Sequence, residues 1–302
     1  MRNIVLVVLA IGIAACGGRP ADVEGVRRVG TTRMFVKEIG AGPSVIVIHG
    51  GPVLDQGYLS PHLEPLSDDF RLVFYDQRMS GRTPIDTSAA VSMDILVSDI
   101  EALREDIGAA SVHLVGHSWG GQLAMRYAIE YPDRVRAMVL VSPMAASTSL
   151  WREEETALAA SVTAEDQSDR QAVLQSAAFQ RFEPAAIEAL MRISFRPQVV
   201  DTASLSRMTF HFEPDYAQRS ERFGALAPEL MNYDIHGSLA DVGAPTLVIY
   251  GAIEPAANLG GLAILESLPD ARMEIIQRAG HFSFAEQPEA FLQVVREFLT
   301  ER

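Results

Sequence analysis

The sequence is poor in cysteine, lysine and aromatic residues. Cys16 is the only cysteine among 302 residues, Lys37 is the only lysine, and aromatic residues make up 7% of the chain. One cysteine excludes an internal disulfide, a four-thiolate metal site and an iron–sulfur cluster. The 25 basic residues are outnumbered by 39 acidic ones, which gives a formal charge of −14. Because phosphate binding needs a basic face, this balance argues against a nucleic-acid partner.

Motifs for cofactors and metals are missing as well. The sequence contains no G-x-G-x-x-G dinucleotide loop, no P-loop and no H-E-x-x-H metal motif. His113 and His117 are four residues apart, but they fall on a predicted strand and the turn after it. That spacing brings two rings to one metal only on a helix. We therefore expect no metal and no cofactor. The oligomeric state does not follow from the sequence.

The first fifteen residues have the pattern of a secretory signal. Arg2 precedes an uncharged apolar run over residues 4–15, which is too short for the roughly 20 residues that a transmembrane helix needs. The tetrapeptide at 13–16, I-A-A-C, resembles a bacterial lipobox, which implies cleavage before Cys16 and lipidation of that residue. We expect a signal peptide over 1–15 and a tether over 16–29. A plain signal peptide and a buried N-terminal strand remain alternatives.

A lipidated Cys16 would place the protein in the bacterial cell envelope. The lipid would be its only contact with a membrane, because the acidic chain has no polybasic segment to bind anionic headgroups. By the same resemblance, Gly17 after the cysteine favours the outer membrane, facing the periplasm, in a Gram-negative cell.

Beyond the tether, short β-branched runs alternate with longer helical patterns. Runs that indicate buried strands lie at 44–48, 71–75, 112–115, 137–141, 246–250 and 273–276, and helical patterns at 93–106, 121–131, 259–268 and 288–301. This alternation predicts an α/β fold with a mostly parallel sheet flanked by helices. Residues 148–239 contain helical patterns and no convincing buried strand. We interpret them as a helical cap inserted into a core formed by 30–147 and 240–302, and the acidic run at 153–155 as a solvated helix face.

The pentapeptide G-H-S-W-G at 116–120 stands between a predicted strand and a predicted helix. In the G-x-S-x-G pattern the serine lies on a strained turn, and the small glycines keep other side chains away from it. This placement predicts that Ser118 is a catalytic nucleophile.

A serine nucleophile needs a base and an acid that orients the base, and in this architecture they follow in the order serine, acid, histidine. Of the seven histidines, His281 follows the last predicted strand. Asp241 precedes the strand at 246–250, whereas Glu254 follows it at the carboxyl edge, where ligands bind in such sheets. We therefore predict His281 as the base and Glu254 as the orienting acid.

The stretch H-G-G-P at 49–52 follows the first core strand. Glycines there allow backbone N–H groups to approach a substrate carbonyl, and proline has no N–H to offer. We predict an oxyanion hole formed by the N–H groups of Gly51 and Trp119.

Four motifs resemble those of the α/β-hydrolase superfamily, and within it most closely the proline iminopeptidase branch: HGGP at 49–52, DQRMSGRT at 76–83, GHSWGG at 116–121 and AGHFSF at 279–284. The resemblance covers residues 30–145 and 240–302. This chain departs from the pattern of that branch at Val53, Met79, His117 and Glu254, the first three replacing glycines and the last an aspartate.

The resemblance implies an α/β-hydrolase fold with a cap and assigns further residues. Asp76, Gln77 and Arg78 are implied to brace the loops beside the site. A cap carboxylate is implied to pair with the free amino terminus of a peptide, and Glu213 has the aromatic neighbours that such a subsite would need. A helix-end carboxylate without that role is the alternative for Glu213.

Together these features predict a serine hydrolase that acts through an acyl-enzyme. The leading substrate is a short peptide with N-terminal proline or a similar small residue. A carboxylesterase or lactonase acting on small acyl substrates is the alternative, since the same groups serve both. The third interpretation is a binding lipoprotein of the same fold without catalysis.

Overall fold

The computed structural model describes residues 22–51 and 53–302. The predicted signal peptide, Cys16 and the first residues of the predicted tether lie outside this range, as does Pro52. In the part of the chain that is described, no helix has both the length and the apolar character needed to cross a bilayer.

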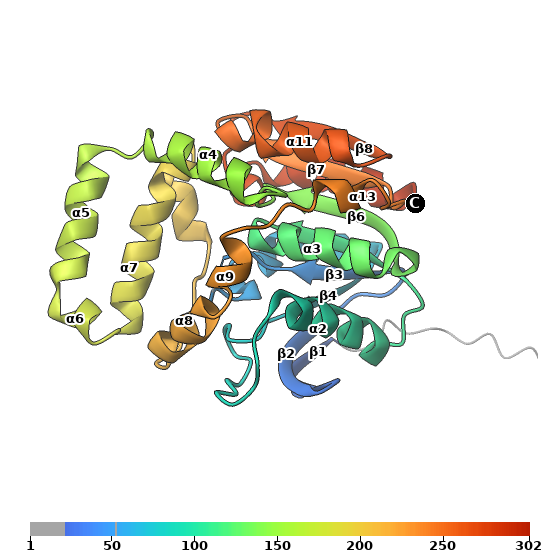
Figure 1. The fold of residues 1–302 in the computed structure, drawn as a ribbon, viewed down its shortest axis with the longest axis horizontal. Coiled ribbons are helices and arrows are strands. Elements are labelled where there is room, and N and C mark those ends of the chain that lie inside the picture. Colours follow the sequence, from blue (N-terminus) through green and yellow to red (C-terminus); the bar gives the residue numbers. More distant parts are fainter. Residues whose placement is uncertain (1–21, 52) are drawn as a thin grey trace, which may run out of the picture.

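One sheet of eight strands forms the centre of the molecule, in the order β1-β2-β4-β3-β5-β6-β7-β8 (Figure 1). The strands are β1 (Val23–Val29), β2 (Thr32–Ile39), β3 (Ser44–Ile48), β4 (Arg71–Tyr75), β5 (Val112–His117), β6 (Val135–Val141), β7 (Thr246–Gly251) and β8 (Ala271–Ile276). Strands β1 and β2 are antiparallel to their neighbours, and the strands from β4 to β8 in the sheet order are parallel. The α/β class and the mostly parallel sheet are confirmed.

The central strands are buried on both faces because helices cover both sides of the sheet. Every residue of β5 and of β7 is buried, which explains their nearly continuous apolar sequences. One apolar core lies between the sheet and α2 (Met93–Asp106), α3 (Trp119–Glu130) and α11 (Gly260–Ser267). A second core lies on the opposite face, under α1 (Ser60–Leu63), α12 (Ser283–Glu286) and α13 (Pro288–Thr300).

The insertion between β6 and β7 is built of helices joined by loops, and residues 148–239, all of which are described, contain no strand. Its helices are α4 (Thr148–Ala159), α5 (Ala164–Gln175), α6 (Ala177–Gln180), α7 (Pro184–Phe195), α8 (Tyr216–Gly224), α9 (Ala227–Leu230) and α10 (His236–Leu239). In Figure 1, α5 to α8 extend beyond one end of the sheet. A bridge between Ser147 and Asp234 joins the two ends of the insertion.

The predicted tether is wrong over its last seven residues, which form β1 and pair with β2. The core therefore begins at Val23 and not at residue 30. The sequence analysis missed both strands, and β1 was hard to find because, with the sequence VEGVRRV, it is a half-exposed edge strand. Its apolar residues neither form a continuous run nor alternate cleanly with polar ones, so the sequence shows little of the hydrophobic periodicity that indicates a strand.

Candidate active site

Ser118 occupies a sharp turn between β5 and α3. Its backbone has φ of 54° and ψ of −117°, a conformation that a side chain disfavours and that is found mainly at functional sites. The Ser118 N–H donates to the carbonyl of Val141 at 2.9 Å, and the N–H of Met144 donates to the carbonyl of Ser118 at 3.0 Å. These bonds to the end of β6 hold the strained turn in place.

The glycines on either side of Ser118 are required by close backbone contacts. A Cβ on Gly120 would lie 2.1 Å from the carbonyl oxygen of Ile48, and one on Gly116 would lie 2.4 Å from the carbonyl oxygen of Gly120. Both contacts are with backbone atoms, so no side chain can rotate to relieve them. The G-x-S-x-G pattern thus follows from how tightly α3 packs on β3 and β5.

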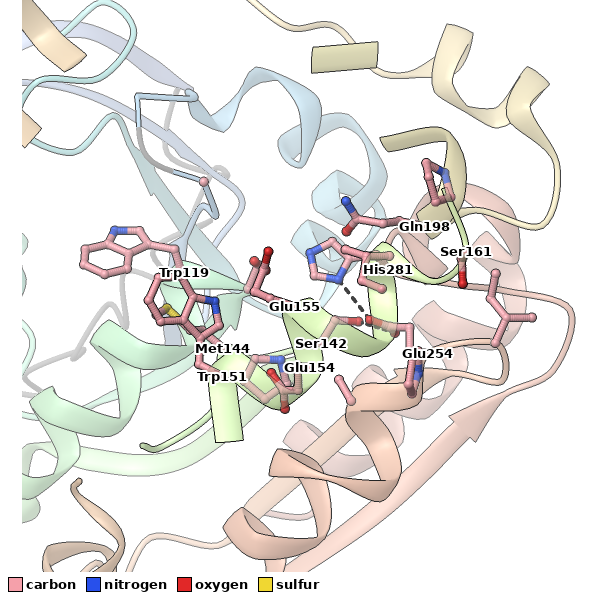
Figure 2. Close-up of a pocket in the computed structure, with 18 of the residues that line it drawn as sticks. Trp119, Ser142, Met144, Trp151, Glu154, Glu155, Ser161, Gln198, Glu254 and His281 are labelled. Carbon is pink, nitrogen blue, oxygen red and sulfur yellow. Dashed lines mark hydrogen bonds and ion pairs between the residues drawn. The ribbon is translucent and has the colours of Figure 1, made fainter. Parts of the chain in front are cut away.

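His281 and Glu254 come from two loops at the carboxyl ends of neighbouring strands, β8 and β7. The Nδ1 atom of His281 lies 2.9 Å from Oε2 of Glu254 (Figure 2). Since the carboxylate accepts, Nδ1 carries the proton and Nε2 keeps its lone pair. The main-chain N–H of His281 donates to the carbonyl of Gln198 in the cap at 2.8 Å, which anchors this loop.

The second oxygen of Glu254 is also held. Oε1 accepts from the hydroxyl of Ser142 at 2.7 Å and from the N–H of Gly251 at 2.8 Å. These two bonds leave Oε2 free to face His281. Asp241, the rejected candidate, is exposed ahead of β7, at the opposite end of that strand. Ser142 escaped prediction because only the packing of β6 beside β7 brings it to Glu254.

A cavity of about 360 Å³ lies between the sheet and the cap, and it brings together Ser118, His281, Glu254, Gly51 and Trp119. The cap contributes Trp151, Glu154, Glu155 and Leu158 from α4, Phe223 from α8 and Leu230 from α9. Most of the remaining wall is apolar, with Pro143, Met144, Pro197, Ile253, Pro255 and Ala256. All five residues predicted for catalysis and the oxyanion hole therefore line one space.

Glu213 does not line this cavity. It is half-buried between Phe212 and Pro214, ahead of α8, so its position does not support the expected contact with substrate. The cap carboxylates in the wall are Glu154 and Glu155 (Figure 2). The interpretation of 153–155 as a solvated face was wrong for Glu154, which is half-buried, whereas Glu153 and Glu155 are exposed. The sequence held a signal for the two wall carboxylates, since residues 151, 154, 155 and 158 share one face of a helix.

Glu154 stands in an unusual electrostatic environment. One of its oxygens accepts from the N–H of Gly260 at 3.1 Å. Burial, with smaller contributions from Glu254 and Glu155, raises the pKa of Glu154 to about 8. The side chain is therefore mostly protonated and uncharged at neutral pH.

The loop at 49–51 lies against the start of α3. Gly51 has a φ of 64°, in the left-handed region that glycine adopts readily. Trp119 is the first residue of α3, where a backbone N–H has no acceptor within the helix. Gln77 connects the two segments: its side chain accepts from the Trp119 indole at 3.0 Å and donates to the carbonyl of His49 at 2.7 Å. These contacts make Gln77 a brace for the predicted oxyanion hole.

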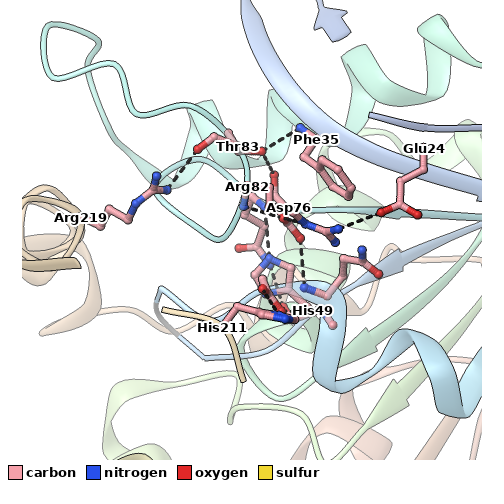
Figure 3. Close-up of polar contacts among 12 residues, drawn as sticks. Glu24, Phe35, His49, Asp76, Arg82, Thr83, His211 and Arg219 are labelled. Carbon is pink, nitrogen blue, oxygen red and sulfur yellow. Dashed lines mark hydrogen bonds and ion pairs between the residues drawn. The ribbon is translucent and has the colours of Figure 1, made fainter. Parts of the chain in front are cut away.

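Asp76 and Arg78 hold the rest of the loop that follows β4. Asp76 is fully buried and accepts from the N–H groups of Gln56 at 3.1 Å and Arg82 at 2.8 Å (Figure 3). Burial and the nearby Asp55 raise the pKa of Asp76 to about 6. Arg78 forms an ion pair with Asp99 at 2.8 Å. These contacts fit the bracing role implied for both residues.

Comparison with known proteins agrees with this geometry. A family model described as the alpha/beta hydrolase fold matches residues 43–288. A proline iminopeptidase of Lactiplantibacillus plantarum is 27% identical over 278 residues, covering 84% of this chain and 91% of the relative. The crystal structure of a proline iminopeptidase from Mycobacterium smegmatis has a TM-score of 0.67 at 22% identity and covers 92% of this chain and 98% of its own. A thermophilic esterase from Thermogutta terrifontis has a TM-score of 0.65 at 23% identity, with coverages of 93% and 98%. At these identities the two structures share the fold.

Proposed function

This chain belongs to the alpha/beta hydrolase family, and from that premise we propose that it is a serine hydrolase that releases an N-terminal proline or a similar small residue from short peptides. One observation carries the proposal: the hydrogen-bonded pair His281–Glu254 lines the same cavity as Ser118 on its strained turn.

In the proposed reaction, the Ser118 hydroxyl attacks the carbonyl carbon of the scissile peptide bond and gives its proton to Nε2 of His281. The negative charge that develops on the carbonyl oxygen is stabilised by the N–H groups of Gly51 and Trp119. Collapse of the intermediate breaks the C–N bond, and His281 returns the proton to the leaving amine. Water then hydrolyses the acyl-enzyme by the same route. Before each proton transfer Glu254 holds the imidazole in the tautomer with Nε2 free, and it stabilises the imidazolium that forms when Nε2 takes the proton.

The cap supports a substrate with a free amino terminus. Glu154 and Glu155 are the carboxyl groups that α4 contributes to the cavity, in a wall that is otherwise mostly apolar. An ammonium group entering this wall would favour ionisation of Glu154 and pair with it. The names of the relatives from Lactiplantibacillus plantarum and Mycobacterium smegmatis point to the same substrate class.

An ester or lactone with a small acyl group is the second candidate. A protonated Glu154 adds no charge to the cavity wall, which suits an uncharged substrate. Attack on an ester carbonyl requires the same nucleophile, base and oxyanion donors. The likeness in fold to an esterase is compatible with this reading.

The peptidase and the esterase or lactonase are separated by their rates on four substrates: proline p-nitroanilide, its N-acetylated form, p-nitrophenyl butyrate and an acyl lactone. A peptidase should prefer the free-amine anilide and lose at least about tenfold in kcat/KM when the amine is blocked. Glu154→Gln and Glu155→Gln should lower kcat/KM on the anilide and not on the ester. Glu153→Gln is the matched control, since Glu153 is exposed and outside the cavity wall. Preference for the ester, with no effect of either glutamine variant, would contradict the peptidase proposal.

Binding of a cation is expected to strengthen as pH rises towards 8. The folded-state pKa of Glu154 is raised from 4.5 to about 8, so the side chain loses its proton, and gains charge, as the pH rises through about 8. The Ki of benzyltrimethylammonium, whose charge does not titrate, should fall by up to about tenfold per pH unit and level off above pH 8. In Glu154→Gln, the Ki of benzyltrimethylammonium should not show this fall of up to about tenfold per pH unit. A wild-type Ki that rises with pH would contradict the assignment.

A further inference from the structure

We propose that His117 and Tyr58 form a positioning unit that holds the three active-site loops at a fixed spacing. The inference rests on the proposed serine hydrolase function and adds two residues that do not touch substrate. His117 directly precedes Ser118, and Tyr58 ends the short 3₁₀ helix η1 (Gln56–Tyr58), which follows the loop carrying Gly51.

A chain of hydrogen bonds joins the loops through these two side chains. The N–H of Gly50 donates to the Tyr58 hydroxyl at 2.7 Å, and that hydroxyl lies 2.6 Å from Nδ1 of His117. Nε2 of His117 lies 3.0 Å from the main-chain carbonyl oxygen of His281. The chain therefore links the residue before Gly51, the residue before Ser118, and His281 itself.

The bonding partners determine the protonation state of His117. A carbonyl oxygen can only accept, so Nε2 carries the proton. Nδ1 is then the acceptor, and the Tyr58 hydroxyl donates to it while accepting from Gly50. Burial, together with His281, lowers the pKa of His117 well below its usual value, which keeps the ring neutral. Each bond of the chain thus has a defined donor and a defined acceptor, and the Tyr58 hydroxyl takes part in two of them.

Neither ring has room to move. Tyr58 is 1% exposed and His117 is 2% exposed. The His117 ring packs against Phe282 and Phe284, with centroids 5.6 Å and 5.1 Å away, and against His281 at 4.8 Å. The backbone of the first loop is equally close, since a Cβ on Gly50 would lie 2.8 Å from Nδ1 of His117 and 2.9 Å from the Tyr58 oxygen. Gly50 is therefore required by this chain.

The chain of hydrogen bonds controls the distances between the reacting groups in the transition state. The oxyanion donor, the nucleophile and the base sit on separate loops, and the chain is bonded next to each of them. Displacement of a reacting group by about 1 Å can cost on the order of 100-fold in rate. Cutting the chain leaves Gly50 N–H and Nδ1 of His117 buried without partners, so the loops would shift to recover hydrogen bonds.

Tyr58→Phe removes only the central hydroxyl and is the decisive variant. We expect kcat on p-nitrophenyl butyrate to fall about 10- to 100-fold, with KM within about twofold, because loop spacing acts on the transition state. Tyr127→Phe is the matched control: Tyr127 is fully buried, and its hydroxyl donates to Glu101 of α2 at 2.6 Å, outside the chain of hydrogen bonds that joins the three loops. It should lose stability and keep its kcat. Equal losses of kcat in both variants, or none in Tyr58→Phe, would overturn the proposal.

Two further measurements keep the proposal separate from the proposed function. In the double variant Tyr58→Phe with His117→Gln, kcat should be no lower than in the poorer single variant, because the residues act as one unit. Full additivity would overturn the proposal. Nitrogen NMR of the wild-type ring should show His117 neutral, protonated on Nε2, from pH 5 to 9, and titration in that range overturns it. Failure of a fluorophosphonate to label the wild type would instead refute the serine hydrolase function, and the ring measurement does not depend on it.

Discussion

Replacement of Ser118 by alanine is expected to lower kcat on the order of 10⁶-fold, the largest effect of any single change in this chain. The oxygen that would form the acyl-enzyme is lost, whereas the cavity, the N–H groups of Gly51 and Trp119 and the His281–Glu254 pair remain. Fold and thermal stability should hardly change, because alanine removes one oxygen from a half-buried residue. Release of p-nitrophenol from p-nitrophenyl butyrate and of p-nitroaniline from proline p-nitroanilide measures the loss.

Labelling by a fluorophosphonate tests the same residue independently of substrate. The reagent should modify the wild-type protein at Ser118 and leave Ser118→Ala unmodified. Ser161→Ala is the control, because Ser161 lines the same cavity and has no proposed part in the chemistry. It should be labelled as fast as the wild type. Equal labelling of Ser118→Ala and the wild type would contradict the assignment of the nucleophile.

Glu254→Gln is expected to lower kcat by about 10⁴-fold. The substituted side chain has nearly the same shape, and its carbonyl oxygen can still accept from Ser142 and Gly251. Its NH₂ group then faces Nδ1 of His281 and donates to it. That contact favours the imidazole tautomer with Nε2 protonated, which cannot take the proton from Ser118. Labelling by the fluorophosphonate should slow by a comparable factor.

Asp241→Asn is the control for this prediction. Asp241 is exposed at the amino-terminal side of β7, whereas Glu254 lies beyond the carboxyl end of that strand. Its loss should change kcat by less than about twofold, as is usual for surface positions remote from a site. If Asp241→Asn reduced turnover more than Glu254→Gln, the assignment of the acid would have to be reversed.

Much of the core could be read from local pattern. The parallel strands are buried on both faces, so their apolar runs are nearly continuous and stand out from the helices between them. The helix predicted at 93–106 matches α2 at both ends, since Ser92 caps its first turn by accepting from the N–H of Ile95. Edge strands lack such a signal, and β1 was therefore mistaken for part of a tether.

The sequence predicted those residues of the candidate site that stand in a motif or directly follow a predicted strand. Ser118 is marked by its glycines, and His281 and Glu254 by their positions after β8 and β7. Glu213 lies outside the cavity wall, and its aromatic neighbours form a pattern that does not determine which way the cap faces the core. The lipidation expected at Cys16 stays a prediction.

The order of strands and helices along the chain was enough to specify a doubly covered parallel sheet, because burial on both faces leaves its mark within a few consecutive residues. It also specified the strained turn at Ser118, since Gly116 and Gly120 are required by contacts within one strand–helix unit and its neighbour. The sequence did not specify which side chains lie close to that turn. Ser142 holding Glu254, Glu154 facing the cavity and His117 reaching His281 depend on segments up to 164 residues apart. Only packing brings such segments together, and no local spacing in the chain encodes their distance.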